Sequence, residues 1–115
     1  MNQEIEQEIQ AKGLTAPRVT PADIEANIVG ENYHSPSDYT LGCGLNVGKY
    51  DPEKIKRHTF CILTLCNGFT VVGVNEGPVS AENFDAELGR KLARAKAVVQ
   101  IWPLMGYALK ERLTA

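Results

Sequence analysis

The sequence predicts a small α+β domain, in which an antiparallel sheet is combined with N-terminal helices and a long C-terminal helical segment. Two β-rich runs, residues 59–66 and 69–74, flank Asn67-Gly68, and this arrangement is the strongest short-range signal of a hairpin. Residues 81–113 are mostly good helix formers with apolar side chains at intervals of three and four. At 115 residues the chain fits one domain, so residues 1–115 are treated as a single unit.

Two short helices are expected before the sheet. Residues 2–12 are rich in Glu and Gln and carry only a narrow apolar stripe, which predicts a helix of marginal stability. Thr20, followed by proline, supplies an N-cap for a second helix that should stop near Gly30. Glycine and proline are frequent over residues 31–52, which predicts an irregular excursion with at most a short strand at residues 39–41.

The central hairpin is expected to turn on Asn67-Gly68 alone, because a two-residue turn of this kind needs positive φ at both positions. That turn would pair Thr64 with Val71 and Ile62 with Gly73. Both faces of such a hairpin are largely apolar, so helices, further strands or a second subunit must cover each side. We therefore expect a homo-oligomer, a dimer or larger.

The C-terminal segment is expected to form a kinked pair of helices. Ser80 is the predicted N-cap of the first helix, and Pro103 should break or kink it before a shorter amphipathic helix. The stripe expected to face the core comprises Phe84, Leu88, Leu92, Ala95, Val99 and Trp102. A neighbouring row of small residues comprises Ala86, Gly89, Ala93 and Ala97, and would allow another helix to approach closely.

The residue types present argue against catalysis and against a bound metal or cofactor. The chain has two histidines and three cysteines, and the cysteines form neither an even set nor a Cys-x-x-Cys pair. On a strand, His58 and Cys61 would point to opposite faces, which excludes the most obvious metal pair. We therefore expect no enzyme, no metal and no cofactor.

Composition and charge also restrict the partners. A pI near 5.7 argues against extended nucleic-acid binding. The sequence has no apolar run near the roughly 20 residues of a membrane span, and its acidic, polar start is unlike a secretory signal. These features predict a cytoplasmic protein that does not enter membranes.

Charge is distributed unevenly along the chain. Residues 1–31 contain six acidic and two basic side chains, whereas residues 86–115 contain six basic and two acidic ones. The basic end could attract a small anion or the chain's own acidic segment, and charge alone does not choose between them. Arg90 and Arg94 lie one helical turn apart and could grip a phosphate or carboxylate, or else form a solvated face with surface ion pairs.

Several strings in the C-terminal half are distinctive in combination. They are Asn67-Gly-Phe-Thr70, Ser80-Ala-Glu-Asn-Phe-Asp85, Gly89-Arg-Lys91, Ile101-Trp-Pro-Leu104, Gly106-Tyr107 and Arg112-Leu113. With these motifs, roughly residues 59–113 resemble the small phage-encoded family called gene-product forty-nine/sixty-six-like. The stretch from Tyr33 to Asp51 departs from the pattern. The resemblance implies a phage or prophage origin and an accessory role in the cytosol of a bacterial host.

That family is in turn similar to the anti-Thoeris sponges, small oligomeric phage proteins that sequester cyclic ADP-ribose signals, and in some cases cyclic oligonucleotides, without cleaving them. The resemblance implies anti-defence activity, with the ligand held near subunit interfaces. For a sponge of this kind, the anion-binding candidates are Arg57, Arg90, Arg94 and Arg112, the amide candidate is Asn83, and the stacking candidates are Phe84 and Trp102. For Phe84 and Trp102, a place in the core is the favoured alternative. The rival hypothesis is a small phage protein that inhibits a host protein by direct contact.

Overall fold

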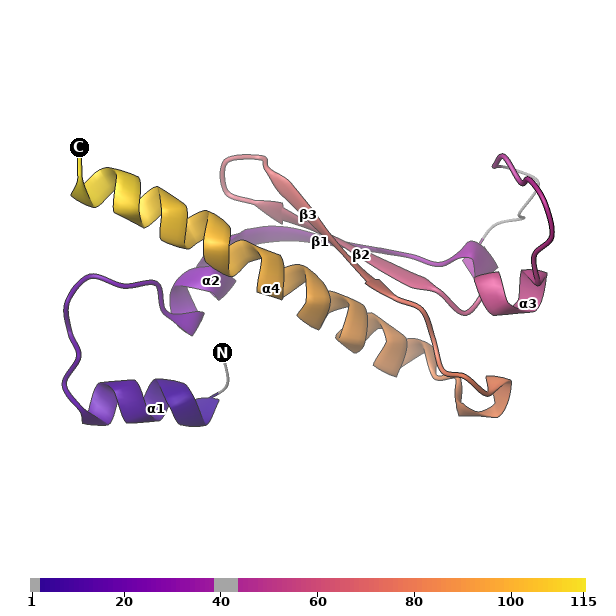
Figure 1. Ribbon diagram of the computed structural model, residues 1–115, viewed down its shortest axis with the longest axis horizontal. Helices are drawn as coiled ribbons and strands as arrows, with labels where there is room; N and C mark the ends of the chain where they lie inside the picture. Colours follow the sequence, from indigo (N-terminus) through magenta and orange to yellow (C-terminus); the bar gives the residue numbers. More distant parts are fainter. Residues whose placement is uncertain (1–2, 39–43) are drawn as a thin grey trace.

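The computed structural model describes residues 3–38 and 44–115 and consists of two main layers. A three-stranded antiparallel sheet, in the order β1-β2-β3, is crossed on one face by a long C-terminal helix (Figure 1). The α+β class, the antiparallel sheet and the long C-terminal helix are as predicted. The elements in chain order are α1 (Gln3–Ala11), α2 (Pro21–Asn27), β1 (Ile28–His34), the 3-10 helix η1 (Pro36–Asp38), α3 (Pro52–Ile55), β2 (Thr59–Leu65), β3 (Thr70–Asn75), the 3-10 helix η3 (Ala81–Asn83) and α4 (Ala86–Leu113).

The helix α2 begins at the predicted cap but ends earlier than expected. The Thr20 hydroxyl accepts a hydrogen bond from the Asp23 amide at 3.1 Å, and the Asp23 carboxylate accepts one from the Thr20 amide at 2.9 Å. The helix ends at Asn27, and β1 begins at the next residue. The prediction of a helix that stops near Gly30, followed by an irregular segment from residue 31, is therefore wrong for residues 28–34. These residues form a strand instead, because pairing with β2 satisfies their backbone hydrogen bonds. The possible strand at residues 39–41 lies outside the described residues.

The register between β2 and β3 differs by one residue from the prediction. Leu63 pairs with Val71, and the Leu65 amide donates to the Phe69 carbonyl at 2.8 Å, so three residues, 66–68, lie inside this last hydrogen-bonded pair. The Gly68 amide donates to the Leu65 carbonyl at 2.8 Å, and Gly68 has a φ of +89°. Asn67 has no positive φ, so the two-residue turn and its pairing were wrong: a three-residue loop needs the left-handed conformation only at its glycine.

This register sorts the apolar side chains of the sheet onto two unlike faces. The face toward α4 carries the buried side chains of Cys61, Leu63, Leu65 and Val71, which with Ile24, Ala93, Ala97 and Ile101 form the core. The opposite face carries Phe60, Ile62, Val72 and Val74. In the described part of the chain no helix packs against this second face, and Val72 is 44% exposed.

The side of α4 that packs on the sheet is the row of small residues, and the predicted core stripe faces away from it except at Trp102, which packs against the core. Gly89, Ala93, Ala97 and Ile101 are buried, whereas Leu88 is 53% exposed. A Cβ added to Gly73 in β3 would lie 2.0 Å from the Ala93 carbonyl oxygen, so the helix backbone rests directly on the strand. The prediction that the large aliphatic stripe forms the core is wrong, because only small side chains fit at this close approach.

The ends and continuity of α4 also differ from the expectation. Ser80 precedes η3 and makes no side-chain cap, while the Asp85 carboxylate accepts from the Leu88 amide at 2.9 Å and caps α4. The helix runs through Pro103 to Leu113 as one element, so the predicted helix pair is wrong. Pro103 removes one backbone donor, and the surrounding turns continue the helix.

The side chain of Gln100 joins α4 to the outer strand of the sheet. Its amide nitrogen donates a hydrogen bond to the backbone carbonyl of Val72. In an antiparallel ladder, hydrogen-bonded and non-hydrogen-bonded pairs alternate, and Val72 and its cross-strand partner Ile62 form a non-hydrogen-bonded pair. The Val72 carbonyl therefore does not bond to β2 and points outward, toward the open edge of the sheet. The helix therefore covers part of both the face and the edge of β3.

Candidate functional site

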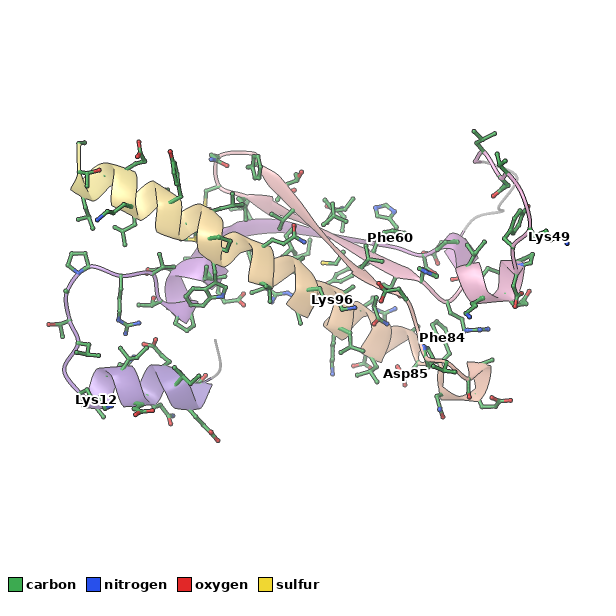
Figure 2. All side chains as sticks on the ribbon, viewed as in Figure 1. Lys12, Lys49, Phe60, Phe84, Asp85 and Lys96 are labelled. Atoms are coloured by element: carbon green, nitrogen blue, oxygen red, sulfur yellow. The ribbon has the colours of Figure 1, made fainter. Side chains whose placement is uncertain are left out.

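A cleft of about 170 Å³ lies where the end of β1 and the start of β2 meet the first turn of α4. It is lined by Tyr33, His34, Ser35, Ser37, Asp38, Thr59, Phe84, Ala86 and Arg90. Figure 2 shows Phe84 and Asp85 beside the first turn of α4, at this end of the sheet. Two of the predicted binding residues, Phe84 and Arg90, are thus brought together, and most of the remaining lining comes from β1 and η1.

The close approach of α4 to β2 determines the shape of this cleft. A Cβ added to Gly89 would lie 3.0 Å from the hydroxyl oxygen of Thr59, a tight contact, so glycine favours the close approach of the first turns of α4 to the strand. Thr59 is itself 4% exposed and forms the floor between the strand and the helix. The side chains of Ala86 and Arg90, which flank Gly89 on α4, then project into the wall of the cleft.

Tyr33 is held in place by a chain of polar contacts behind the cleft. Its hydroxyl donates to the Oε1 oxygen of Glu31 at 2.7 Å, and the same oxygen accepts a hydrogen bond from Arg94 Nε at 3.0 Å. Burial, together with the Glu31 carboxylate, raises the pKa of the Tyr33 hydroxyl well above its ordinary value of 10.0, so it stays protonated and remains a donor. Arg94 therefore positions Tyr33 through Glu31.

Arg94 is engaged by two carboxylates from different elements. Its guanidinium donates to both oxygens of Glu25 in α2, at 2.8 and 3.2 Å, and to Glu31 in β1. These hydrogen bonds lower the pKa of both glutamates below 4.5. Of the two alternatives predicted for Arg94, the structure shows the grip on carboxylates: its side chain is only 27% exposed and ties α2, β1 and α4 together.

Arg90 differs from Arg94 although only one helical turn separates them. It is exposed at the cleft and makes no ion pair with any of the residues that the structure describes. Phe84 lies on the same cleft with its side chain partly accessible, at 36%. An unpaired guanidinium beside two aromatic rings can contact an anionic group and a flat apolar group in one ligand.

The polar end of the cleft comes from the segment after β1. The Ser35 hydroxyl donates to the Lys56 carbonyl at 3.0 Å, and the Ser35 amide donates to the Asp38 carboxylate at 3.0 Å. These contacts fix the turn of η1 and leave His34 exposed beside the cleft. Sequence reasoning missed this side of the site, because apolar and polar residues do not alternate along Ile28–His34 and no strand was expected there.

The other predicted binding residues lie outside this cleft. Arg57 is half-buried, and its Nε is buried without a hydrogen-bond partner in the part of the chain that the structure describes. Asn83 is exposed at the end of η3. Trp102 packs against the core. Arg112 is exposed in the last turn of α4, and a rise of 1.5 Å per residue places it about 33 Å from Arg90.

Over residues 3–38 and 44–115 the structure offers neither a membrane-spanning helix nor a metal cluster. In these ranges no helix has both the length and the apolar character to cross a membrane. Within the same ranges, no three or more His, Cys, Asp or Glu side chains are grouped so that they could hold a metal ion. The cleft itself combines one arginine, two aromatic rings and a polar end.

Comparison with known proteins gives one match. The family model for the phage protein family described as N4 Gp49/phage Sf6 gene 66 matches residues 19–113. No curated protein and no solved structure matches the chain. The matched range contains the sheet, α4 and every residue that lines the cleft, whereas α1 precedes it.

Proposed function

The chain belongs to the phage protein family of N4 Gp49 and phage Sf6 gene 66, and on that premise we propose that it binds and sequesters a small nucleotide signal without cleaving it. The ligand class is a cyclic nucleotide of bacterial immunity, either a cyclic ADP-ribose isomer or a cyclic oligonucleotide. The observation that supports this class is the guanidinium of Arg90, which has no ion pair among the described residues, in the same cleft as the rings of Tyr33 and Phe84.

Each part of such a ligand has a matching group in the cleft. Arg90 would hold a phosphate oxygen through charge-assisted hydrogen bonds, and Phe84 would supply the surface on which a base stacks. The first turn of the 28-residue helix α4 adds a favourable potential for negative charge at this end. His34 and Ser37 lie at the polar end, where hydrogen bonds to a ribose or a base edge would form.

The mode of action proposed is sequestration. The Ser35 hydroxyl is already committed to a backbone carbonyl, and the Asp38 carboxylate accepts a backbone amide, so neither is arranged as a nucleophile and base. Small-molecule pockets commonly enclose about 300–1,000 Å³, and the cleft of one chain encloses about 170 Å³. A nucleotide would therefore extend beyond the walls supplied by this chain alone.

The proposal is tested by titration calorimetry of the purified protein against cyclic ADP-ribose isomers and cyclic di- and trinucleotides. With a compound that binds, Arg90→Gln should weaken affinity by about 2 kcal/mol, roughly thirtyfold, through loss of a charge-assisted contact. The wild-type affinity should also fall as salt is raised. Thin-layer or mass analysis of the ligand after incubation should recover it unchanged.

A matched control is available on the same helix. Arg112→Gln removes an arginine from the far end of α4 and should leave the affinity at its wild-type value. Wild-type affinity in the Arg90 variant, or silence across the whole panel, would reject the cleft as a nucleotide site. The second candidate function, inhibition of a host protein by contact, would then be favoured by the exposed aliphatic side chains on the outward face of α4.

A further inference from the structure

The polar end of the cleft uses its own hydrogen-bond donors to hold its shape. The Ser35 hydroxyl donates to the Lys56 carbonyl at 3.0 Å, and the Ser35 amide donates to the Asp38 carboxylate at 3.0 Å. The hydroxyl and the amide of Ser37 both donate to the Ser35 hydroxyl oxygen, at 2.9 and 3.3 Å. Because each of these hydrogens already has an acceptor, this end of the cleft offers mainly oxygen lone pairs to a bound molecule.

Tyr33 and Asp38 extend this acceptor character. The Tyr33 hydroxyl gives its hydrogen to Glu31 at 2.7 Å, so a molecule in the cleft can meet only the lone pairs of the Tyr33 oxygen. Asp38 is exposed, and its Oδ2 accepts the Ser35 amide, while its Oδ1 accepts no hydrogen bond from the residues that the structure describes. His34, exposed at the same end, can still donate through a ring N–H.

The opposite wall of the cleft has the reverse character. Arg90 on α4 offers only N–H donors, and it makes no ion pair within residues 3–38 and 44–115. A negative group is therefore attracted toward Arg90 and repelled by the Asp38 carboxylate at η1. Both side chains line the same cleft of about 170 Å³, so a bound molecule experiences both.

From this arrangement we infer, on the basis of the function proposed above, that Asp38 determines the specificity of the cleft. It selects a nucleotide that presents hydrogen-bond donors to η1, and it directs the phosphate to Arg90. Two parts of a nucleotide carry such donors, namely the hydroxyls of a ribose and the N–H groups on the edge of guanine. An anion without donors, such as pyrophosphate, gains nothing at the η1 end and is repelled by the carboxylate.

The test compares Asp38→Asn with the wild type by titration calorimetry against cyclic ADP-ribose, cyclic di-AMP and cyclic di-GMP. Asparagine still offers an oxygen to the Ser35 amide but carries no charge. For a compound that the wild type binds, loss of the charge-assisted hydrogen bond should weaken affinity by about 10-fold or more. Pyrophosphate, titrated alone, should bind the variant about threefold more tightly than the wild type, because the repulsion is removed.

The opposite signs of these two changes distinguish recognition from distortion. A variant that merely disturbs the turn after β1 would weaken both kinds of probe. Asp51→Asn is the matched control, because Asp51 is also exposed and its carboxylate also accepts a backbone amide, that of Glu53, at 3.1 Å. Asp51 does not line the cleft, so its variant should keep the wild-type affinity for every probe.

Two further comparisons identify the donors that Asp38 recognises. The 2′-deoxy analogue of a compound that binds lacks a ribose hydroxyl, and cyclic di-IMP lacks only the 2-amino groups of cyclic di-GMP. The analogue without the recognised donor should bind the wild type about 10-fold more weakly than its parent, and Asp38→Asn should remove that difference. Equal binding of both analogues and their parents overturns the inference.

The remaining results separate the role of Asp38 from the proposed function. A weaker nucleotide and a tighter pyrophosphate in Asp38→Asn, with an unchanged Asp51→Asn, support that role. Unchanged nucleotide affinity in Asp38→Asn, or no gain for pyrophosphate, overturns the role of Asp38 and leaves the cleft as a nucleotide site. A wild type that binds none of the three cyclic compounds overturns both.

Discussion

The inward and outward faces of α4 contrast in a way that composition does not reveal. The inward face is made of Gly89, Ala93 and Ala97 and is buried, while the outward face displays larger aliphatic side chains to solvent. The difference arises from distance, because the helix backbone lies so close to Gly73 that larger inward side chains cannot fit. The size of an apolar residue on this helix therefore indicates how far away its packing partner lies.

The largest expected effect comes from closing the gap on the inward face. Gly73→Ala would place a Cβ 2.0 Å from the Ala93 carbonyl oxygen and 2.4 Å from the Ala97 amide nitrogen, so helix and strand must separate. Because backbone atoms cannot rotate away, we expect a loss of about 3 kcal/mol or more in the free energy of unfolding. Chemical denaturation of the variant and the wild type measures this.

Gly30→Ala is the control for this change. Its Cβ would lie 3.4 Å from Thr64, an ordinary contact, and the change should stay within about 0.5 kcal/mol. Equal stability of the Gly73 variant and the wild type would show that α4 does not lie on β3 in the way described.

A smaller effect is expected at the boundary between the two faces, where Arg94 joins α4 to α2 and β1. Arg94→Gln should cost about 1 kcal/mol at neutral pH, a value discounted because the Glu25 and Glu31 side chains are more than one third exposed. The folded-state pKa of both glutamates is lowered from 4.5, so this stabilisation is present above that pH and is lost as the pH falls through their folded values.

The measurement is the difference in unfolding free energy between wild type and Arg94→Gln from pH 7 to pH 3. The difference should shrink below about pH 4.5, where the carboxylates become protonated. Lys91→Gln, which removes an exposed pair with Glu87, should show little difference at any pH. A constant difference across this range would mean that Arg94 acts through packing rather than through its two ion pairs.

The smallest effect is a gain on the outward face. Nothing lies within 4 Å of a Cβ added to Gly106, so Gly106→Ala should raise the unfolding free energy by about 0.5–1 kcal/mol through helix propensity. Thermal unfolding at a fixed protein concentration detects a change of this size. A loss of stability would mean that another chain approaches the helix backbone at this position.

Elements with local signals could be predicted from the sequence, and those that depend on distant partners could not. The Thr20 cap, the β-rich runs around Asn67-Gly68 and the helix formers after Asp85 all act within a few residues. The strand β1 has no such signal, because it is stabilised by pairing with β2 far along the chain. Which face of α4 is buried depends on Gly73 in β3, and the spacing of apolar residues along α4 carries no information about that glycine.

The residues of the candidate site also fall into those that could be predicted from local signals and those that could not. Phe84 and Arg90 were predicted because they belong to the recognisable start of α4, and both line the cleft. Tyr33 and His34 were missed together with β1, which carries them. Arg90 and Arg94 looked equivalent in sequence, and only the fold shows that Glu25 and Glu31 engage one of them.

The hydrogen bond from Gln100 to the Val72 carbonyl has a consequence for aggregation. An outer strand with free carbonyls is a template on which strands of other molecules can add, as in fibrils. Here the acceptor that such a strand would need at the middle of β3 is already taken by a side chain from α4. Growth of the sheet along this edge would have to displace Gln100, so copies of the chain are directed to meet through faces rather than through continuous sheets.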